Sequence, residues 1–299
     1  MGKIAFVFSG QGDQYPGMGK ELASKYAAAD EIYKMCDKLR PGTSAQCFEG
    51  CEEELSETVN TQPCLFATEL ALAEVLTQKG VRPDAAAGFS LGEVTAAAFA
   101  GLFDRETGFR LVCERGRLMQ QEAVRYDTAM AAVVKLSSEE VIRICRRFDR
   151  IYPVNFNCPG NTSFSGLAEQ MPEFFAEVKK AGGRALPLKV KGAFHSPFMA
   201  KAAESFAVKL AEAGAGKTRI PLYSNVTGEI YSGDPKDLLA RQISSPVRWE
   251  TIIRNMIASG TDKFIEIGPG RTLTNMIKKI DPQVTAVTGF EYLQEANPC

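Results

Sequence analysis

Residues 86–95 read Ala-Ala-Gly-Phe-Ser-Leu-Gly-Glu-Val-Thr and place Ser90 in the pattern Gly-x-Ser-x-Gly. In many α/β enzymes this pattern forms a sharp turn between a strand and a helix, with a nucleophilic serine at its tip. The glycines let the backbone pass close to its neighbours. Free N–H groups at the start of the following helix could stabilise an oxyanion beside the serine. Because the pattern also occurs by chance, it predicts a nucleophile only weakly on its own.

A serine hydroxyl needs a base that removes its proton, and histidine is the usual base. The chain contains one histidine, His195, in a loop of small residues before an expected helix. A single histidine is more often structural than catalytic. If Ser90 is the nucleophile, however, His195 is the only available imidazole, so each residue strengthens the interpretation of the other.

Composition and charge limit the classes of function. The 299 residues are 45% hydrophobic and 24% charged, with a net charge of −1. Nucleic acids and anionic membranes are therefore not expected partners. Neither a transmembrane segment nor a signal peptide is evident, so we expect a cytoplasmic protein.

The eight cysteines, the last of them Cys299, lack metal-ligand spacing, so we expect free thiols and no metal site. Cys113 and Cys158 are expected to be buried and inert.

The order of the expected elements predicts an α/β fold with an inserted small subdomain. Residues 1–125 and 191–299 form a hydrolase-like body with a parallel sheet that carries Ser90. Residues 126–190 show the order βαββαβ of a ferredoxin-like unit. The functional cleft is expected between the two parts.

Within the body, local patterns predict individual elements. Helices are expected over 20–39 and 61–79, with Pro63 suited to the first turn of the second helix. A strand is expected over 221–225.

Seven stretches, in the same order and spacing, make the chain resemble a known family. It is similar to the malonyl-CoA:acyl-carrier-protein transacylases of fatty-acid synthesis and to the acyltransferases of polyketide synthases. The stretches are residues 8–12, 88–93, 114–120, 153–157, 194–196, 245–249 and 266–270. Each is weak alone, but together they cover nearly the whole chain.

The resemblance implies a role for each catalytic group. Ser90 attacks the malonyl thioester and carries the acyl group as an ester. His195 is the general base and then the general acid for the leaving thiol. The backbone carbonyl of Gln242 orients the imidazole, and the backbone N–H groups of Gln11 and Leu91 form the oxyanion hole.

Arg115 is implied to bind the free carboxylate of the malonyl group. A guanidinium grips a carboxylate through two hydrogen bonds, which selects dicarboxylic over simple acyl groups. Arg117 lies on another face of the same helix and is expected to be solvated. Glu93 has two open interpretations. The first is a functional role, as support of the serine loop or as a contact at the pocket wall, and the second is a favourable interaction with the helix dipole.

The implied substrates are malonyl-CoA and the phosphopantetheine thiol of acyl carrier protein, used in ping-pong order without a bound cofactor. The chain is expected to act as a monomer. The alternatives are a discrete acyltransferase or an acyl-carrier hydrolase of a polyketide synthase. Arg115 argues against the hydrolase, because a carboxylate-binding residue suits malonyl. A general esterase is a further alternative, but it needs an acid between the serine and the histidine in sequence and gives no reason for the ferredoxin-like insert.

One residue departs from the family pattern. Many members have histidine directly before the nucleophile, whereas this chain has Phe89. That histidine is not the base, so the implied mechanism survives. Phe89 is expected to narrow or dry the acyl pocket, or to change which acyl groups it tolerates.

Overall fold

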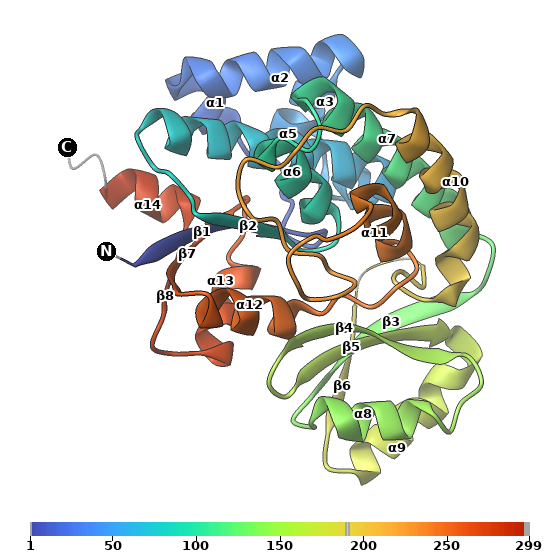
Figure 1. Cartoon of the computed structure of the whole chain (residues 1–299). Coiled ribbons are helices and arrows are strands. Elements are labelled where there is room, and N and C mark those ends of the chain that lie inside the picture. Colours follow the sequence, from blue (N-terminus) through green and yellow to red (C-terminus); the bar gives the residue numbers. More distant parts are fainter. Residues whose placement is uncertain (1, 189, 191, 296–299) are drawn as a thin grey trace.

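In the computed structural model, which describes residues 2–188, 190 and 192–295, the chain forms two four-stranded sheets (Figure 1). Cys299 and the boundary expected at residue 191 lie outside the described residues. Every cysteine within the described ranges is a free thiol. The same ranges contain no helix long and apolar enough to cross a membrane.

The first sheet is parallel and has the strand order β2-β1-β7-β8. Its strands are β1 (Lys3–Phe8), β2 (Ala85–Gly88), β7 (Thr261–Ile267) and β8 (Thr285–Thr288). Side chains of β1 alternate between two cores, with Phe6 and Phe8 in one and Ala5 and Val7 in the other. A parallel sheet with both faces buried explains why β1 is a continuous apolar run.

Helices cover both faces of this sheet. The core around Phe6 and Phe8 takes side chains from α1 (Lys20–Lys25), α2 (Ala27–Leu39), α3 (Thr43–Glu49), α4 (Glu52–Ser56), α5 (Thr58–Gln78), α6 (Leu91–Ala100), α7 (Arg105–Ala123), α10 (Ala200–Glu212), α11 (Pro235–Gln242) and α14 (Gly289–Glu295). The opposite core takes side chains from α12 (Trp249–Ala258) and α13 (Thr272–Ile280).

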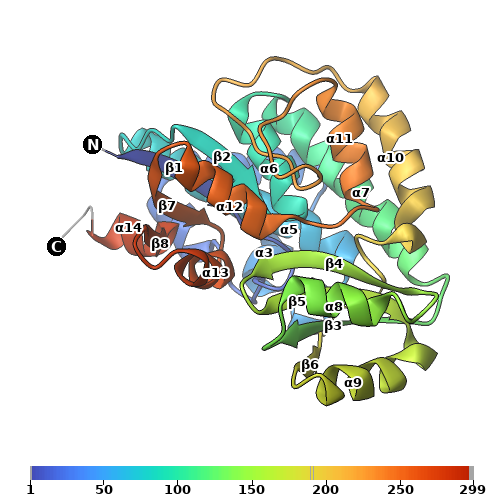
Figure 2. The same ribbon diagram turned by 60° about the horizontal axis from the view of Figure 1, so that its bottom comes forward.

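The second sheet is antiparallel and has the strand order β4-β5-β3-β6. Its strands are β3 (Thr128–Val134), β4 (Ile151–Cys158), β5 (Asn161–Leu167) and β6 (Arg184–Pro187). Helices α8 (Ser138–Cys145) and α9 (Met171–Lys180) cover the face turned away from the body (Figure 2). The expected order βαββαβ is confirmed for this segment.

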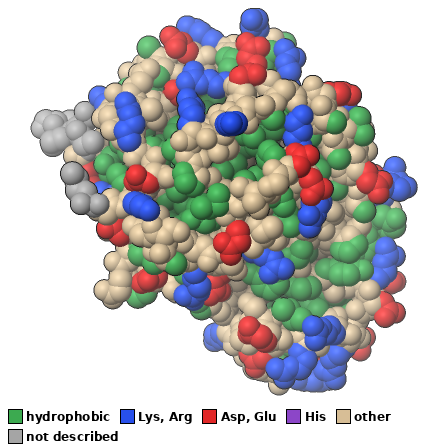
Figure 3. Space-filling view, in the orientation of Figure 1, with side chains coloured by type: hydrophobic (Ala, Val, Ile, Leu, Met, Phe, Trp, Pro, Cys, Tyr) green, Lys and Arg blue, Asp and Glu red, His purple; other side chains and the backbone are tan. Residues whose placement is uncertain are grey.

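Basic side chains gather over α8 and α9, at the lower end of the face in Figure 3. Some of these charges are paired locally, since Arg147 and Lys180 both bind Glu177.

The opposite face of the small sheet meets the body. Val247, just before α12, exchanges backbone hydrogen bonds of 2.8 and 2.9 Å with Val154 and Phe156 of β4. These bonds fix β4 beside the body.

The parallel register brings two loops to one edge of the first sheet. Phe8, the last residue of β1, pairs with Gly88 of β2 and with Ile267 of β7. The loops that follow β1 and β2 therefore begin side by side. In open parallel sheets, ligands bind beyond the carboxyl ends of the strands. These two loops carry Gln11 and Ser90.

Three local predictions need correction. The helix expected over 20–39 is two helices, because Tyr26 has extended backbone between α1 and α2. Helix α5 starts at Thr58, so Pro63 lies inside the helix rather than in its first turn. The segment 221–225 forms only isolated bridges instead of a strand. Helices α3, α4 and α14 and strand β8 were not predicted.

Candidate active site

Ser90 lies at the tip of a sharp turn between β2 and α6. Its backbone has a positive φ of 56°, which is unusual for a residue with a side chain. A Cβ at Gly88 would lie 1.9 Å from the carbonyl carbon of Gly92, and one at Gly92 would lie 2.3 Å from the Ser9 oxygen. Both positions therefore require glycine, and the turn presents the Ser90 hydroxyl at the sheet edge.

Ser90 and His195 form a hydrogen-bonded pair. The Ser90 Oγ lies 2.7 Å from Nε2 of His195. Nδ1 of His195 lies 2.9 Å from the backbone oxygen of Gln242. A carbonyl oxygen can only accept, so Nδ1 carries the hydrogen and Nε2 is left to accept the serine proton. This tautomer is the one that a general base requires.

Arg115 points from α7 into the same site and is 1% exposed. Its Nη1 donates to Oε1 of Gln62 over 2.9 Å, and its Nη2 donates to Oε1 of Gln242 over 2.7 Å. Nη2 also lies 3.2 Å from the Ser90 Oγ, and Nε has no hydrogen-bond partner among the described residues. The cation is thus surrounded by amide and hydroxyl groups within reach of the serine.

A cavity of about 80 Å³ opens at the serine. Its apolar walls include Phe89, Met119, Met130, Leu188, Val190 and Phe194. Its polar edge contains Gln11, Gln62 and Asn155 beside the Ser90–His195 pair. The space is much smaller than a typical ligand pocket of about 300–1,000 Å³. It therefore suits a short group attached to Ser90.

Two backbone N–H groups are available beside this cavity. In the described part of the chain, neither Gln11 nor Leu91 donates its backbone N–H to a protein acceptor. Leu91 is the first residue of α6, where the helix itself provides no acceptor. The N–H of Ser90, in contrast, donates to Oδ1 of Asn225 over 2.8 Å. The geometry thus offers two donors, from Gln11 and Leu91.

Comparison with known proteins places the chain in a family. The family described as "Acyl transferase domain" matches residues 5–289. The chain is 37% identical over 296 residues to a malonyl CoA-acyl carrier protein transacylase of Bacillus subtilis, covering 96% of this chain and 93% of that protein.

The chain belongs to the acyl transferase domain family.

Solved structures agree with this assignment. A malonyl CoA-acyl carrier protein transacylase from Clostridium perfringens matches with a TM-score of 0.94 and 33% identity, covering 98% of this chain and 96% of that one. A malonyl-transacylase in complex with a type II polyketide synthase acyl-carrier protein matches with a TM-score of 0.93 and 34% identity, covering 99% and 100%.

Burial and nearby charges shift the pKa values of His195 and Arg115 in this acyltransferase. Burial, together with the positive charge of Arg115, lowers the pKa of His195 to about 4. Burial lowers the pKa of Arg115 to about 10, which the charge of Glu93 opposes. At neutral pH, His195 is therefore a neutral imidazole and Arg115 is a cation.

Glu93 is fully buried under the turn. Its Oε1 accepts hydrogen bonds from the backbone N–H of Asn225 and the hydroxyl of Tyr231. Of the two interpretations of Glu93, support of the serine loop therefore fits the structure better. Arg117 is exposed, as predicted, and donates to Glu114.

Several residues of the site were missed by sequence reasoning. They are Gln62, Asn225 and Tyr231. Asn225 lies 135 positions from Ser90 and Gln62 lies 53 positions from Arg115. No motif around them signals these contacts, because only the fold brings them together. The Oδ1 of Asn155 is buried at the cavity without a partner among the described residues.

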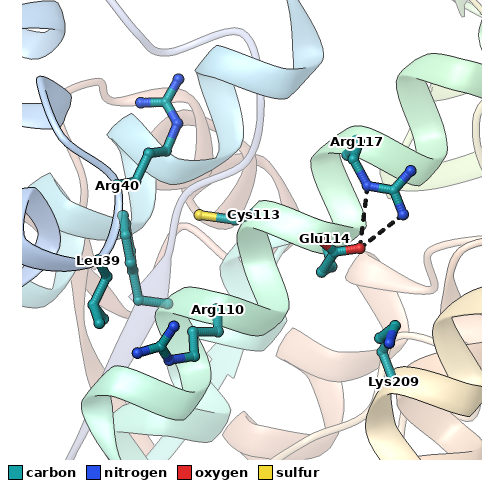
Figure 4. A pocket seen from close by; sticks show the side chains of 8 residues that line it. Leu39, Arg40, Arg110, Cys113, Glu114, Arg117 and Lys209 are labelled. Atoms are coloured by element: carbon teal, nitrogen blue, oxygen red, sulfur yellow. Dashed lines mark hydrogen bonds and ion pairs between the residues drawn. The ribbon is translucent and has the colours of Figure 1, made fainter.

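A second, larger hollow of about 650 Å³ lies along α7, between the end of α2 and α10 (Figure 4). Its cations are Arg40, Arg110, Arg117 and Lys209. Three of them already bind acceptors in the protein, which are Asn60, Glu114 and Glu212. Cys113, also in its lining, is only partly buried, so the prediction that it is buried was wrong in this respect. Burial nevertheless raises the pKa of its thiol to about 12, which fits the predicted inertness. We assign this hollow no part in the reaction.

The single histidine makes its pKa directly measurable by NMR in tag-free protein. We expect the His195 imidazole to stay neutral down to about pH 5, since its pKa lies near 4. Arg115→Gln should raise this pKa, because a nearby positive charge is removed. Arg117→Gln, which alters an exposed cation of the same helix, is the control and should leave it unchanged. A wild-type midpoint near 6.5 would contradict the electrostatics described here.

Proposed function

We propose that this acyltransferase moves the malonyl group from malonyl-CoA to the phosphopantetheine thiol of an acyl carrier protein, in fatty-acid biosynthesis. The observation that carries the proposal is the buried cation of Arg115, 3.2 Å from the Ser90 hydroxyl. A simple acyl group has no use for a cation at this place, whereas the free carboxylate of malonyl does. The malonyl transacylases of Bacillus subtilis and Clostridium perfringens support the same substrate.

The first half-reaction acylates the serine. Ser90 Oγ attacks the thioester carbonyl, and its proton moves to Nε2 of His195. The carbonyl oxygen becomes an oxyanion that accepts from the N–H groups of Gln11 and Leu91. When the tetrahedral intermediate collapses, the carbon–sulfur bond breaks and His195 gives its proton to the departing CoA sulfur. The malonyl group remains as an ester on Ser90.

Gln242 replaces the carboxylate that orients histidine in many serine enzymes. Its backbone oxygen accepts from Nδ1 without adding a negative charge. Burial and the charge of Arg115 keep the imidazolium unfavourable, and the hydrogen bond to the Gln242 oxygen opposes this effect only in part. His195 therefore holds the serine proton only briefly and returns it readily to the leaving thiol.

The second half-reaction reverses these steps with a different thiol. The carrier's phosphopantetheine thiol gives its proton to His195 and attacks the malonyl ester, and Ser90 leaves as the hydroxyl. CoA and the carrier present the same pantetheine arm, so one cleft serves both in ping-pong order. The protein's own groups supply base, acid and oxyanion donors, and we propose that the reaction uses no bound cofactor.

Arg115 also protects the ester. The malonyl carboxylate would accept a hydrogen bond from Nη2 in place of the free Ser90 hydroxyl, while Gln62 and Gln242 keep the guanidinium oriented. The cavity of about 80 Å³ leaves little room for water beside a short acyl group. Phe89 contributes to this cavity, with its ring 5.6 Å from that of Trp249 in an edge-on contact. We propose that Phe89 narrows and dries the pocket.

We further propose that residues 1–125 and 191–299 form a hydrolase-like body and that residues 126–190 form a ferredoxin-like subdomain. The strand orders of the two sheets support this division. The active-site cavity takes residues from both parts, with Met130, Asn155, Leu188 and Val190 from the smaller one. A cytoplasmic, monomeric protein stays a prediction from the sequence.

A second candidate is the same transfer in polyketide synthesis. The observation that favours it is the similar malonyl-transacylase in complex with a type II polyketide synthase carrier. The chemistry at Ser90 would be identical, and only the carrier protein would differ.

The direct test is intact-mass analysis after incubation with malonyl-CoA. We expect one malonyl adduct, located on Ser90, that disappears when a phosphopantetheinylated carrier protein is added and reappears on the carrier. Ser90→Ala should form no adduct. A wild-type protein that hydrolyses malonyl-CoA without passing the group to any carrier would favour the hydrolase alternative instead.

The substrate selectivity tests Arg115 separately. Arg115→Ala should lose most of the preference for malonyl-CoA over acetyl-CoA, by about 10²-fold in the ratio of kcat/KM, because a charge-assisted carboxylate contact is lost. Arg117→Ala removes a neighbouring but exposed arginine and should keep the wild-type ratio. An unchanged ratio in Arg115→Ala would remove its role in binding the carboxylate.

A further inference from the structure

A buried polar cluster lies directly behind the nucleophile. It consists of Glu93, Asn225 and Tyr231, and both Glu93 and Asn225 are 0% exposed. Glu93 Oε1 accepts from the Asn225 backbone N–H over 3.0 Å and from the Tyr231 hydroxyl over 2.6 Å. Burying polar side chains is costly unless they are hydrogen-bonded, so the cluster calls for a physical reason.

Asn225 holds the serine turn at two points. Its Oδ1 accepts from the Ser90 backbone N–H over 2.8 Å, and its Nδ2 donates to the Gly88 carbonyl oxygen over 2.6 Å. The side chain therefore links the end of β2 to the residue at the tip. Ser90 has a positive φ, a conformation that persists only when the surroundings hold it in place. Asn225 supplies such a constraint from a distant part of the chain.

The same contact decides which N–H groups face the reacting carbonyl. Because the Ser90 N–H is bound to Asn225, it is not available to an oxyanion. Gln242 holds the other polar group of the Ser90 backbone, as its Nε2 donates to the Ser90 backbone oxygen over 2.5 Å. Both polar groups of the Ser90 backbone are thus held by side chains, and the serine hydroxyl alone is free to react.

We propose that Asn225, anchored by Glu93, is a positioning residue that fixes the nucleophile turn. Its side chain also keeps the Ser90 N–H in a structural hydrogen bond, so that this N–H does not bind the oxyanion. The proposal rests on the proposed function for the identity of the acyl group. Its geometry, however, concerns only the nucleophile and applies to any electrophile that Ser90 attacks.

The Glu93 side chain acts in two separate ways, as a hydrogen-bond acceptor for Asn225 and as a negative charge near Arg115. As the acceptor for Asn225, it needs only one oxygen at the place of Oε1, which glutamine can also supply. Its negative charge acts on Arg115, whose pKa it raises. Burial raises the pKa of Glu93 itself to about 7, and the hydrogen bonds of Tyr231 and Asn225 oppose this shift. With both effects included, the pKa of Arg115 is about 10, so Arg115 is charged at neutral pH.

The test measures single-turnover acylation of Asn225→Ala by malonyl-CoA. We expect the acylation rate constant to fall by about 10²-fold, the scale expected for a nucleophile misplaced by about 1 Å. The KM for malonyl-CoA should change by less than about threefold, because Arg115 and the cavity are untouched. An acylation rate equal to that of the wild type, in folded protein, would overturn the proposal.

Asn157→Ala is the matched control. Asn157 is another buried asparagine, and its Nδ2 donates to Asn161 and Ser163 within the small sheet, away from Ser90. Its truncation should lower the melting temperature without slowing acylation by more than about threefold. If both variants slow acylation equally, general destabilisation explains the effect and the proposal fails.

Glu93 variants keep the proposal testable if Asn225→Ala does not fold. Glu93→Gln retains an acceptor for the Asn225 N–H and should keep acylation within about threefold of the wild type. Glu93→Ala leaves Asn225 unanchored, and we expect acylation to slow by about tenfold. This effect is smaller than that of Asn225→Ala, because the Asn225 side chain is still present. Equal rates for the two variants would contradict the anchoring role.

A fluorophosphonate probe separates this proposal from the proposed function. Ser90 Oγ attacks phosphorus, fluoride leaves, and the serine proton passes to His195, with no malonyl group involved. Slower labelling of Asn225→Ala, together with no malonyl adduct on the wild type, would overturn the proposed function alone. A malonyl adduct on the wild type with equally fast labelling of both proteins would overturn the positioning role alone.

Discussion

The buried positive charge of Arg115 is the constraint on which the rest of the site depends. A cation removed from water needs compensation, yet its hydrogen-bond partners are the amide oxygens of Gln62 and Gln242 and the hydroxyl of Ser90. These neutral groups orient the guanidinium without neutralising it. The site therefore keeps a positive charge that can attract a carboxylate beside its nucleophile, and we propose that this charge selects a dicarboxylic acyl group.

The same charge determines how His195 works. A carboxylate beside Nδ1 would stabilise the imidazolium and would also compete with the substrate for Arg115. The structure instead uses the neutral carbonyl of Gln242, and burial together with the charge of Arg115 lowers the pKa of His195 to about 4. In the proposed function, substrate recognition and the pKa of the base are thus coupled through one arginine. The carboxylate whose charge acts on Arg115, that of Glu93, accepts a hydrogen bond from Asn225 and none from His195.

Sequence reasoning reached the parts of this arrangement that have local signatures. The glycines around Ser90 follow from a turn that excludes Cβ atoms, and the βαββαβ order follows from alternating strand and helix patterns. The positions of Gln62, Asn225 and Tyr231 could not be predicted, because they depend on contacts between residues more than fifty positions apart. Glu93 remained ambiguous for the same reason, since its burial depends on the segment around Asn225. The division of 20–39 into two helices depends on one extended residue, Tyr26, which periodicity does not reveal.

A crystal structure of the malonyl ester on Ser90 would test the central claim most directly. We expect the terminal carboxylate within hydrogen-bond distance of both Nη atoms of Arg115. We also expect the ester carbonyl oxygen to face the N–H groups of Gln11 and Leu91, with the Ser90 N–H still bound to Asn225. A carboxylate directed to solvent, away from Arg115, would contradict the account.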